Sequence, residues 1–152
     1  MMKVCQGRIT SRFGFRTHPI TGVRKLHNGV DIACPINTPV YSPCEGIVVA
    51  TYDHHTGGKT LLLRAFVTDD RYSFAHLNAF TRKVGEIVKR GELIAYSGNT
   101  GASTGAHLHF GKAINGYWVD NTCYDHEFID PTPDIDIDQS KPIVPTPKEF
   151  KK

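Results

Sequence analysis

Turn-forming residues interrupt the sequence so often between Gly7 and Asp120 that no long amphipathic helix is expected there. The apolar residues between these turns lie in short runs, and no long window shows a 3.6-residue apolar periodicity. The Asn115-Gly116 pair is a strong signal for a two-residue β-hairpin turn. We therefore predict an all-β fold, in which an antiparallel β-sheet forms a sandwich or half-barrel and long loops border an open groove.

The predicted strands are short segments rich in β-branched and aromatic residues, each bounded by turn residues. They are residues 39–41, 46–52, 60–67, 72–75, 92–96, 108–113 and 117–119. A chain of 152 residues fits one domain that buries enough apolar surface to fold without disulfides.

The composition changes near the end of the chain. We expect residues 1–129 to form the folded domain and residues 130–152 to form a flexible tail, because the latter hold five prolines, five acidic residues, four lysines and almost no core-forming side chains. Asp134, Asp136 and Asp138 alternate like a row of calcium ligands. The isoleucines between them, and the lack of a loop glycine and a terminal glutamate, favour a solvated acidic stretch over an EF-hand.

Charge and hydropathy narrow the possible partners. The net charge is +3 and the basic residues are scattered, so we expect no nucleic-acid partner. No apolar run approaches the roughly 20 residues that cross a bilayer, and residues 1–8 lack the apolar segment of a secretory signal. We expect a monomer that does not span a membrane.

The four cysteines are Cys5, Cys34, Cys44 and Cys123, and they form no Cys-x-x-Cys pair of the kind that binds zinc. Free buried thiols are favoured over disulfides. A disulfide between Cys34 and Cys44 is the alternative if the protein works outside a cell.

A glycine-rich loop at residues 98–106 leads directly into a His-x-His pair. On a strand, side chains two residues apart point the same way, so His107 and His109 share one face while Leu108 and Phe110 enter the core. Their α-carbons are then roughly 7 Å apart, which allows two metal ligands, or one ligand and one histidine that contacts a water on the same ion. The alternative is a pair of surface histidines beside a turn.

His27 and Asp31 are separated by Asn28-Gly29-Val30. On a straight strand the two side chains would be about 13 Å apart, too far to share an ion. Asn28 and Gly29 tolerate positive φ, so a tight turn there would bring the imidazole and the carboxylate together. Such a pair is as compatible with a hydrogen-bonded His-Asp contact as with two metal ligands.

His76 ends an aromatic run in which Tyr72, Phe74 and His76 are expected to share a face. A single histidine of this kind is more often structural than functional. Two histidines and one carboxylate, however, make an open catalytic zinc site whose remaining position holds a water with a pKa near 7. Two further histidines would then serve proton transfer and oxyanion stabilisation.

Several motifs occur in an order that resembles the lysostaphin-type, LytM-like zinc endopeptidases, a class of peptidoglycan hydrolases. The resemblance covers residues 9–120 and is carried by ITSRFGFRTHPITG (9–22), HNGVD (27–31), TPVY (38–41), FAHL (74–77) and STGAHLHF (103–110). It implies that His27, Asp31 and His109 bind one zinc ion. It also implies that His107 and His76 are the catalytic pair, with His107 moving protons and His76 stabilising the oxyanion.

The same resemblance implies bacterial peptidoglycan as substrate, with cleavage of its cross-links or stem peptides. Ala106 stands where the family commonly has proline, and Cys44 where it tends to have a small residue, but neither change removes a ligand. Arg16 and His18 receive no metal role, and His54, His55 and His126 are expected at the surface.

Two other functions stay open from the sequence. One is a catalytically silent wall-binding module or activator of another hydrolase, and the other is a biotinyl or lipoyl carrier domain, which residues 84–94 resemble without a suitable flanking motif for a modified lysine. We expect the protein to act on the cell wall. It would do so either as a phage lysin or a virion or conjugation component released from the cytoplasm, or as a trimmed secreted enzyme.

Overall fold

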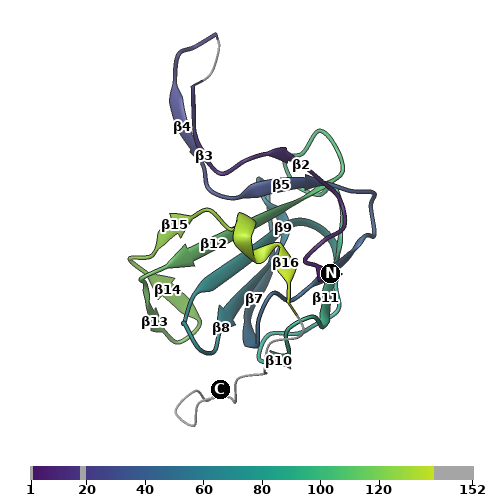
Figure 1. The fold of residues 1–152 in the computed structure, drawn as a ribbon, viewed down its shortest axis with the longest axis vertical. Coiled ribbons are helices and arrows are strands. Elements are labelled where there is room, and N and C mark those ends of the chain that lie inside the picture. The colour runs from purple at the N-terminus through teal and green to yellow at the C-terminus, as the bar shows by residue number, and fades with distance from the viewer. Residues whose placement is uncertain (1, 18–19, 139–152) are drawn as a thin grey trace.

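The computed structural model describes residues 2–17 and 20–138. This part of the chain is built almost entirely of antiparallel strands, with one short 3-10 helix, η1 (Thr132–Asp134), as Figure 1 shows. The sheets do not close into a barrel, and the predicted all-β fold is confirmed. No helix among the described residues has the length and apolarity needed to cross a membrane.

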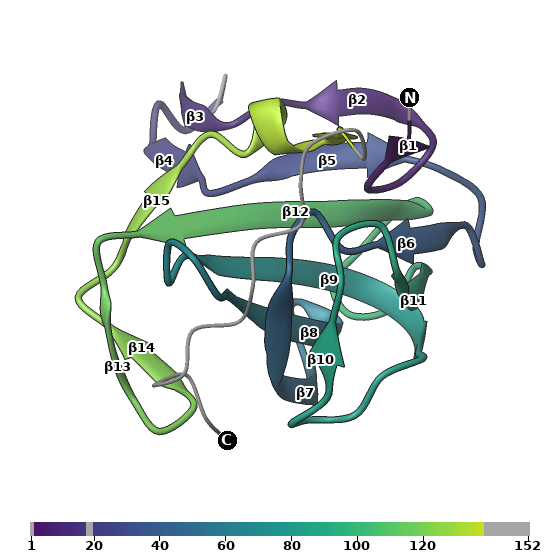
Figure 2. The same ribbon diagram turned by 60° about the horizontal axis from the view of Figure 1, so that its bottom comes forward.

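The largest sheet contains ten strands. Its main order is β10 (Ile87–Val88), β7 (Gly46–His54), β8 (Gly58–Ala65), β9 (Arg71–Phe80), β12 (His107–Ile114), β5 (Val30–Ala33) and β2 (Arg8–Ser11). To this order are added β11 (Leu93–Ser97), which pairs with β9 and with β6 (Pro39–Tyr41), and β15 (Glu127–Ile129), which pairs with β12. Figure 2 shows β9, β12, β5 and β2 side by side across this sheet.

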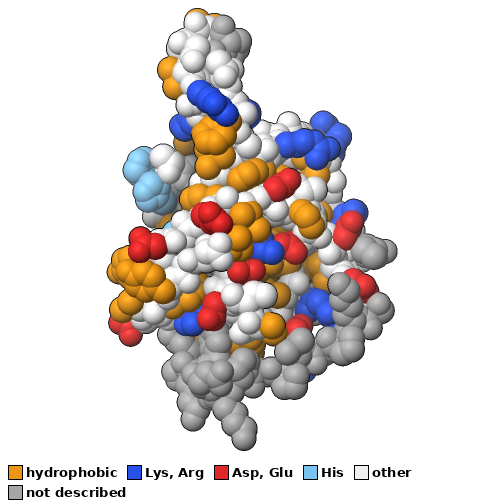
Figure 3. All heavy atoms as spheres, turned by 60° about the vertical axis from the view of Figure 1, so that its left-hand side comes forward, with side chains coloured by type: hydrophobic (Ala, Val, Ile, Leu, Met, Phe, Trp, Pro, Cys, Tyr) orange, Lys and Arg blue, Asp and Glu red, His pale blue; other side chains and the backbone are white. Residues whose placement is uncertain are grey.

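Three two-stranded sheets complete the fold. They are β1 (Met2–Lys3) with β16 (Asp136–Ile137), β3 (Gly14–Thr17) with β4 (Arg24–His27), and β13 (Tyr117–Val119) with β14 (Thr122–Tyr124). The β3–β4 arm stands out from the body of the molecule in Figures 1 and 3. On this arm the guanidinium of Arg24 covers the exposed ring of Phe15, 4.5 Å from its centroid.

The main core lies on one face of the large sheet. Phe110 on β12 stacks on Phe74 of β9, with ring centroids 5.4 Å apart, and both side chains are fully buried. Leu108 is buried beside them. Since alternate residues of a strand face opposite sides, burial of Leu108 and Phe110 turns the intervening polar residues of β12 to the other face. That face carries the candidate site.

Each predicted strand overlaps an observed one, and the strands that were not predicted are short. In the first third of the chain β2, β3 and β4 were not predicted, because charged and polar residues alternate with few apolar ones and give little pattern. These strands form through pairing with β5 or with each other rather than through burial of a continuous apolar face.

The expectation of an extended tail from residue 130 is wrong for residues 130–138. Ile135 and Ile137 are 8% and 2% exposed and belong to the main core, and β16 pairs with β1. Asp136, between the two isoleucines, is exposed and accepts a hydrogen bond from Lys3 (2.7 Å), and the half-buried Asp134 at the end of η1 accepts one from Lys112 (2.7 Å). The segment thus passes from the short helix η1 into the two-residue strand β16. The rest of the expected tail, residues 139–152, lies outside the described residues.

The cysteines were expected to be free and buried; all four are free, but only Cys5 and Cys34 are buried, while Cys44 and Cys123 are half-buried. All four cysteines are free thiols, so the alternative Cys34–Cys44 disulfide is not present. The Sγ atoms of Cys5 and Cys34 lie 3.4 Å apart in the core, a contact that the sequence did not suggest. It links the N-terminal segment to the end of β5, the strand that carries Asp31.

Two isoleucines give a matched test of the core. Ile94 on β11 is fully buried, whereas Ile87 on β10 is 55% exposed. We expect Ile94→Ala to lower the free energy of unfolding by about 2–5 kcal/mol, because it removes buried contacts and leaves a cavity. We expect Ile87→Ala to change it by less than about 0.5 kcal/mol. Urea unfolding of the three proteins measures both, and equal losses would contradict this placement of the core.

Candidate metal centre

The register between β12 and β5 builds the centre of the site. His109 pairs directly with Asp31, and directly opposed side chains on neighbouring antiparallel strands lie on the same face. The Nδ1 atom of His109 is 2.9 Å from Oδ1 of Asp31. Two groups separated by 77 intervening residues are thereby brought into contact by one pair of strands.

His27 joins this pair from the end of β4. Its Nε2 lies 3.3 Å from Oδ2 of Asp31, so the chain does turn between the two residues as expected. The expected use of positive φ is wrong, however, since neither Asn28 nor Gly29 has a positive φ. Glycine is needed at position 29 for a different reason. A Cβ there would lie 2.5 Å from the carbonyl oxygen of Phe110 and 2.8 Å from Nε2 of His109.

Hydrogen bonds hold both imidazoles in a fixed orientation. The Nδ1 of His27 lies 2.9 Å from the carbonyl oxygen of Arg12, and the Nε2 of His109 lies 3.1 Å from Oδ1 of Asn28. With a metal bound, these nitrogens would carry the ring hydrogens and donate them, and the opposite nitrogens would present lone pairs toward the ion. Sequence reasoning missed Arg12 and Asn28, because a carbonyl or amide partner leaves no pattern.

One ligand atom from each of His27, Asp31 and His109 can be chosen so that all three atoms lie within 4.8 Å of one another. Two imidazole nitrogens and a carboxylate oxygen are the donor set of many catalytic zinc sites with an open fourth position. The orienting hydrogen bonds on the far side of each ring are also those that metal-binding histidines usually make. The residues present therefore fit a zinc ion.

His107 lies next to this cluster on the same face of β12. Its Nε2 is 3.7 Å from Oδ1 of Asp31, and its Nδ1 is 2.8 Å from the carbonyl oxygen of Gly105. A hydrogen bond to Gly105 fixes the ring through Nδ1 and directs Nε2 at the cluster. The expected alternation, with Leu108 and Phe110 in the core, is observed.

His76 reaches the site through a local irregularity in β9. Lys59 pairs with Leu77 but Leu61 pairs with Phe74, so β9 contains one extra residue, which is a β-bulge. His76 itself has φ of 61°, a conformation uncommon for residues other than glycine. The expectation that His76 shares a face with Phe74 is therefore wrong. The bulge turns His76 away from the core and leaves Leu77 buried in its place.

The result is a pair of adjacent imidazoles beside the cluster. The rings of His76 and His107 have centroids 4.6 Å apart, and Nδ1 of His76 lies 2.7 Å from the carbonyl oxygen of Thr100. Burial lowers the pKa of His76, and the hydrogen bond to Thr100 offsets only part of that effect.

The carboxyl of Asp31 is held in its charged form. Burial alone raises its pKa, but the hydrogen bond from His109 and the nearby imidazoles of His27 and His107 outweigh burial and place the pKa below its ordinary value. A charged carboxylate is the form that binds metal.

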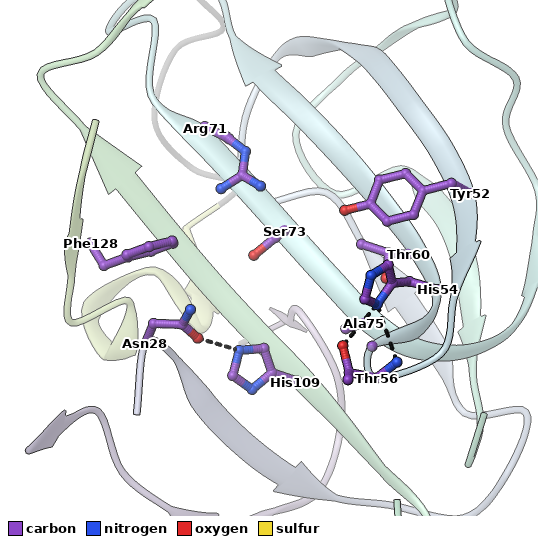
Figure 4. Close-up of a pocket in the computed structure, with 11 residues that line it drawn as sticks. Asn28, Tyr52, His54, Thr56, Thr60, Arg71, Ser73, Ala75, His109 and Phe128 are labelled. Carbon is purple, nitrogen blue, oxygen red and sulfur yellow. Dashed lines mark hydrogen bonds between the residues drawn. The ribbon is translucent and has the colours of Figure 1, made fainter. Parts of the chain in front are cut away.

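Pockets open on both sides of the cluster. One is bordered by Asp31, His107 and the loop at residues 104–106. The other lies beyond His109 and is shown in Figure 4, where side chains from β7, β8, β9, β12 and β15 surround it. His54 and His55 are exposed as expected, and His54 borders this second pocket, while His126 is half-buried.

All five predicted side chains thus lie together, and comparison with known proteins places the chain among peptidases. Residues 25–121 match the family described as Peptidase family M23. The DD-carboxypeptidase/endopeptidase Mpg of Neisseria meningitidis serogroup B is 40% identical over 111 residues, which are 72% of this chain and 25% of that protein. This chain therefore corresponds to about a quarter of such a relative.

Solved structures agree. The catalytic domain of lysostaphin from Staphylococcus simulans superposes with a TM-score of 0.68 at 32% identity, over 84% of this chain and 90% of that domain. A zinc-containing peptidase from Vibrio cholerae superposes with a TM-score of 0.68 at 38% identity, over 80% of this chain and 37% of that one. The fold, the site and the sequence match lead to one conclusion: this chain belongs to peptidase family M23.

Proposed function

We propose that this chain is a zinc endopeptidase that hydrolyses peptide cross-links or stem peptides of bacterial peptidoglycan. The observation that carries the proposal is the cluster of His27, Asp31 and His109 with two further oriented imidazoles beside it and a pocket on either side. Membership of the M23 family and similarity to a DD-endopeptidase and to lysostaphin support the choice of substrate.

In this proposal His27, Asp31 and His109 hold one zinc ion through Nε2, a carboxylate oxygen and Nδ1. Zinc bound there would act as a Lewis acid toward the attacking water and the scissile carbonyl group. The hydrogen bonds from His27 to Arg12 and from His109 to Asn28 keep the donor atoms aimed at the ion.

His107 is proposed as the base. With Nδ1 bonded to Gly105, its Nε2 has a free lone pair directed at the cluster, so it accepts a proton from the attacking water and later gives it to the leaving amine. His76 has its Nδ1 hydrogen committed to Thr100. It therefore donates to the developing oxyanion from Nε2 only when it also carries a proton there.

The alternative of a catalytically silent wall-binding protein has no observation in its favour, because all five site residues are present and meet in space. Action at the bacterial cell wall is part of the proposal, and the absence of a nucleic-acid partner and the monomeric state stay predictions.

Zinc content tests the ligand assignment. We expect about one zinc ion per chain in the purified protein, and a loss of most of it in Asp31→Ala and His109→Ala, because each change removes one of three donors. His55→Ala is the control, since this exposed histidine lies outside the cluster, with its ring tilted against that of His54, and its loss should leave zinc content unchanged. Elemental analysis of dialysed proteins gives the answer. Full zinc content in both ligand variants would rule out this site.

Wall digestion tests the catalytic pair separately. We expect zinc-loaded protein to release new amino groups from purified peptidoglycan, and a chelator to stop the release. His107→Ala should keep its zinc and lose about 10²–10⁴-fold in rate, and His76→Ala about 10²–10³-fold. Wild-type rates in a zinc-containing His107→Ala protein would contradict the role of His107, and no release by zinc-loaded wild type would contradict the function.

A further inference from the structure

Arg71 occupies an unusual place beside the candidate site. It lies on β9 in alternation with Ser73 and Ala75, and Ala75 pairs with His109 across the strands. All four residues border the same pocket. In Figure 4 the guanidinium of Arg71 points into the pocket from the end opposite His109.

No carboxylate of the described residues neutralises the positive charge of Arg71. The side chain is half-buried, and burial lowers its pKa. Among residues 2–17 and 20–138 no carboxylate forms an ion pair with it. Withdrawing a cation from water without an anion beside it is costly. A site of this kind is therefore suited to a ligand that supplies the anion.

Arg64 provides the contrast. It pairs directly with Arg71 across β8 and β9, so two arginines lie opposite each other on one face, an arrangement that destabilises a sheet. Arg64 is compensated, because its Nε is 3.0 Å from Oδ1 of Asp69 and its guanidinium covers the ring of Trp118. Arg71 has no such partner within residues 2–17 and 20–138, and its guanidinium faces the pocket instead.

The surroundings of Arg71 suit a carboxylate. The hydroxyl groups of Tyr52 and Ser73 border the same space and can donate hydrogen bonds, and the ring of Phe128 forms the opposite wall, as Figure 4 shows. A guanidinium flanked by hydroxyl donors binds a carboxylate through two parallel hydrogen bonds. The lining contains no acidic residue that would compete.

We propose that Arg71 is a specificity-determining residue that binds a free carboxylate of the peptide substrate. The proposal rests on the proposed peptidase function and extends it by naming what the pocket selects. Arg71 and Ala75 are four residues apart on a strand, about 13 Å between α-carbons. Part of that span is covered by the arginine side chain, so the carboxylate lies roughly two to four residues from the scissile bond along an extended peptide.

The direct test is binding by chelator-treated protein, which separates recognition from cleavage. The probes are synthetic peptides around a D-alanyl bond, with one free carboxylate placed one to four residues away on either side, each with a carboxamide twin. For wild type we expect the acid to bind about tenfold or more tightly than its amide at two to four residues. In Arg71→Gln this difference should vanish, and in Arg71→Lys it should return in part.

Arg64→Gln is the matched control. It should keep the wild-type difference between acid and amide, and it should lower the thermal midpoint because it removes the contacts with Asp69 and Trp118. Arg71→Gln should leave the midpoint equal or higher, since it removes a half-buried charge that no described carboxylate compensates. A lower midpoint in Arg71→Gln together with an unchanged acid preference would show a structural role and overturn the proposal.

Failure of the two proposals can be told apart. If wild type prefers no acid over its amide at any position, or if Arg71→Gln keeps the preference, the role of Arg71 is refuted, whatever the cleavage assay shows. If zinc-loaded wild type cleaves neither the peptides nor peptidoglycan, the peptidase function fails, and an acid preference lost in Arg71→Gln would still establish the carboxylate site.

Discussion

The hydrogen-bonded register between β5 and β12 is the constraint on which the rest of the site depends. It sets His109 opposite Asp31, and it holds only because Leu108 and Phe110 are buried on the other face of β12. A slip by one residue would place the histidines in the core and the apolar residues in the groove, at a cost of two buried large side chains. Burial of Leu108 and Phe110 on one face of β12 thus stabilises the register that places His109 beside Asp31 on the other face.

Around this pair the chain departs from regular structure where the site needs it. The bulge in β9 and the positive φ of His76 bring a fourth histidine to the site, and Gly29 lets the β4–β5 turn approach Phe110 and His109 closely. Such local strain and close contact are costly for stability and are common at functional sites. Arg71 is another feature that is costly for stability, because no carboxylate in the described part of the chain compensates its charge.

Sequence analysis could predict those features that depend on local patterns. The alternation at residues 107–110 and the all-β fold follow from side-chain period and turn signals. A turn between His27 and Asp31 was also predicted, although it does not use the positive φ expected at Asn28 or Gly29. Sequence analysis could not predict features set by strand pairing over long distances. The extra residue in β9 appears only when Lys59 and Leu61 are seen opposite it, and Ile135 and Ile137 look like tail residues until β16 pairs with β1. Cys5 and Cys34 meet for the same reason.

The central claim is that two imidazoles and one carboxylate, brought together by β4, β5 and β12, surround a single zinc ion. X-ray absorption at the zinc edge of the loaded protein tests this most directly, since it reports the atoms bound to the metal. The account predicts nitrogen and oxygen neighbours at about 2.0–2.2 Å and no sulfur. A shell at about 2.3 Å, the distance of zinc to thiolate sulfur, would place the ion at the cysteines and contradict the account.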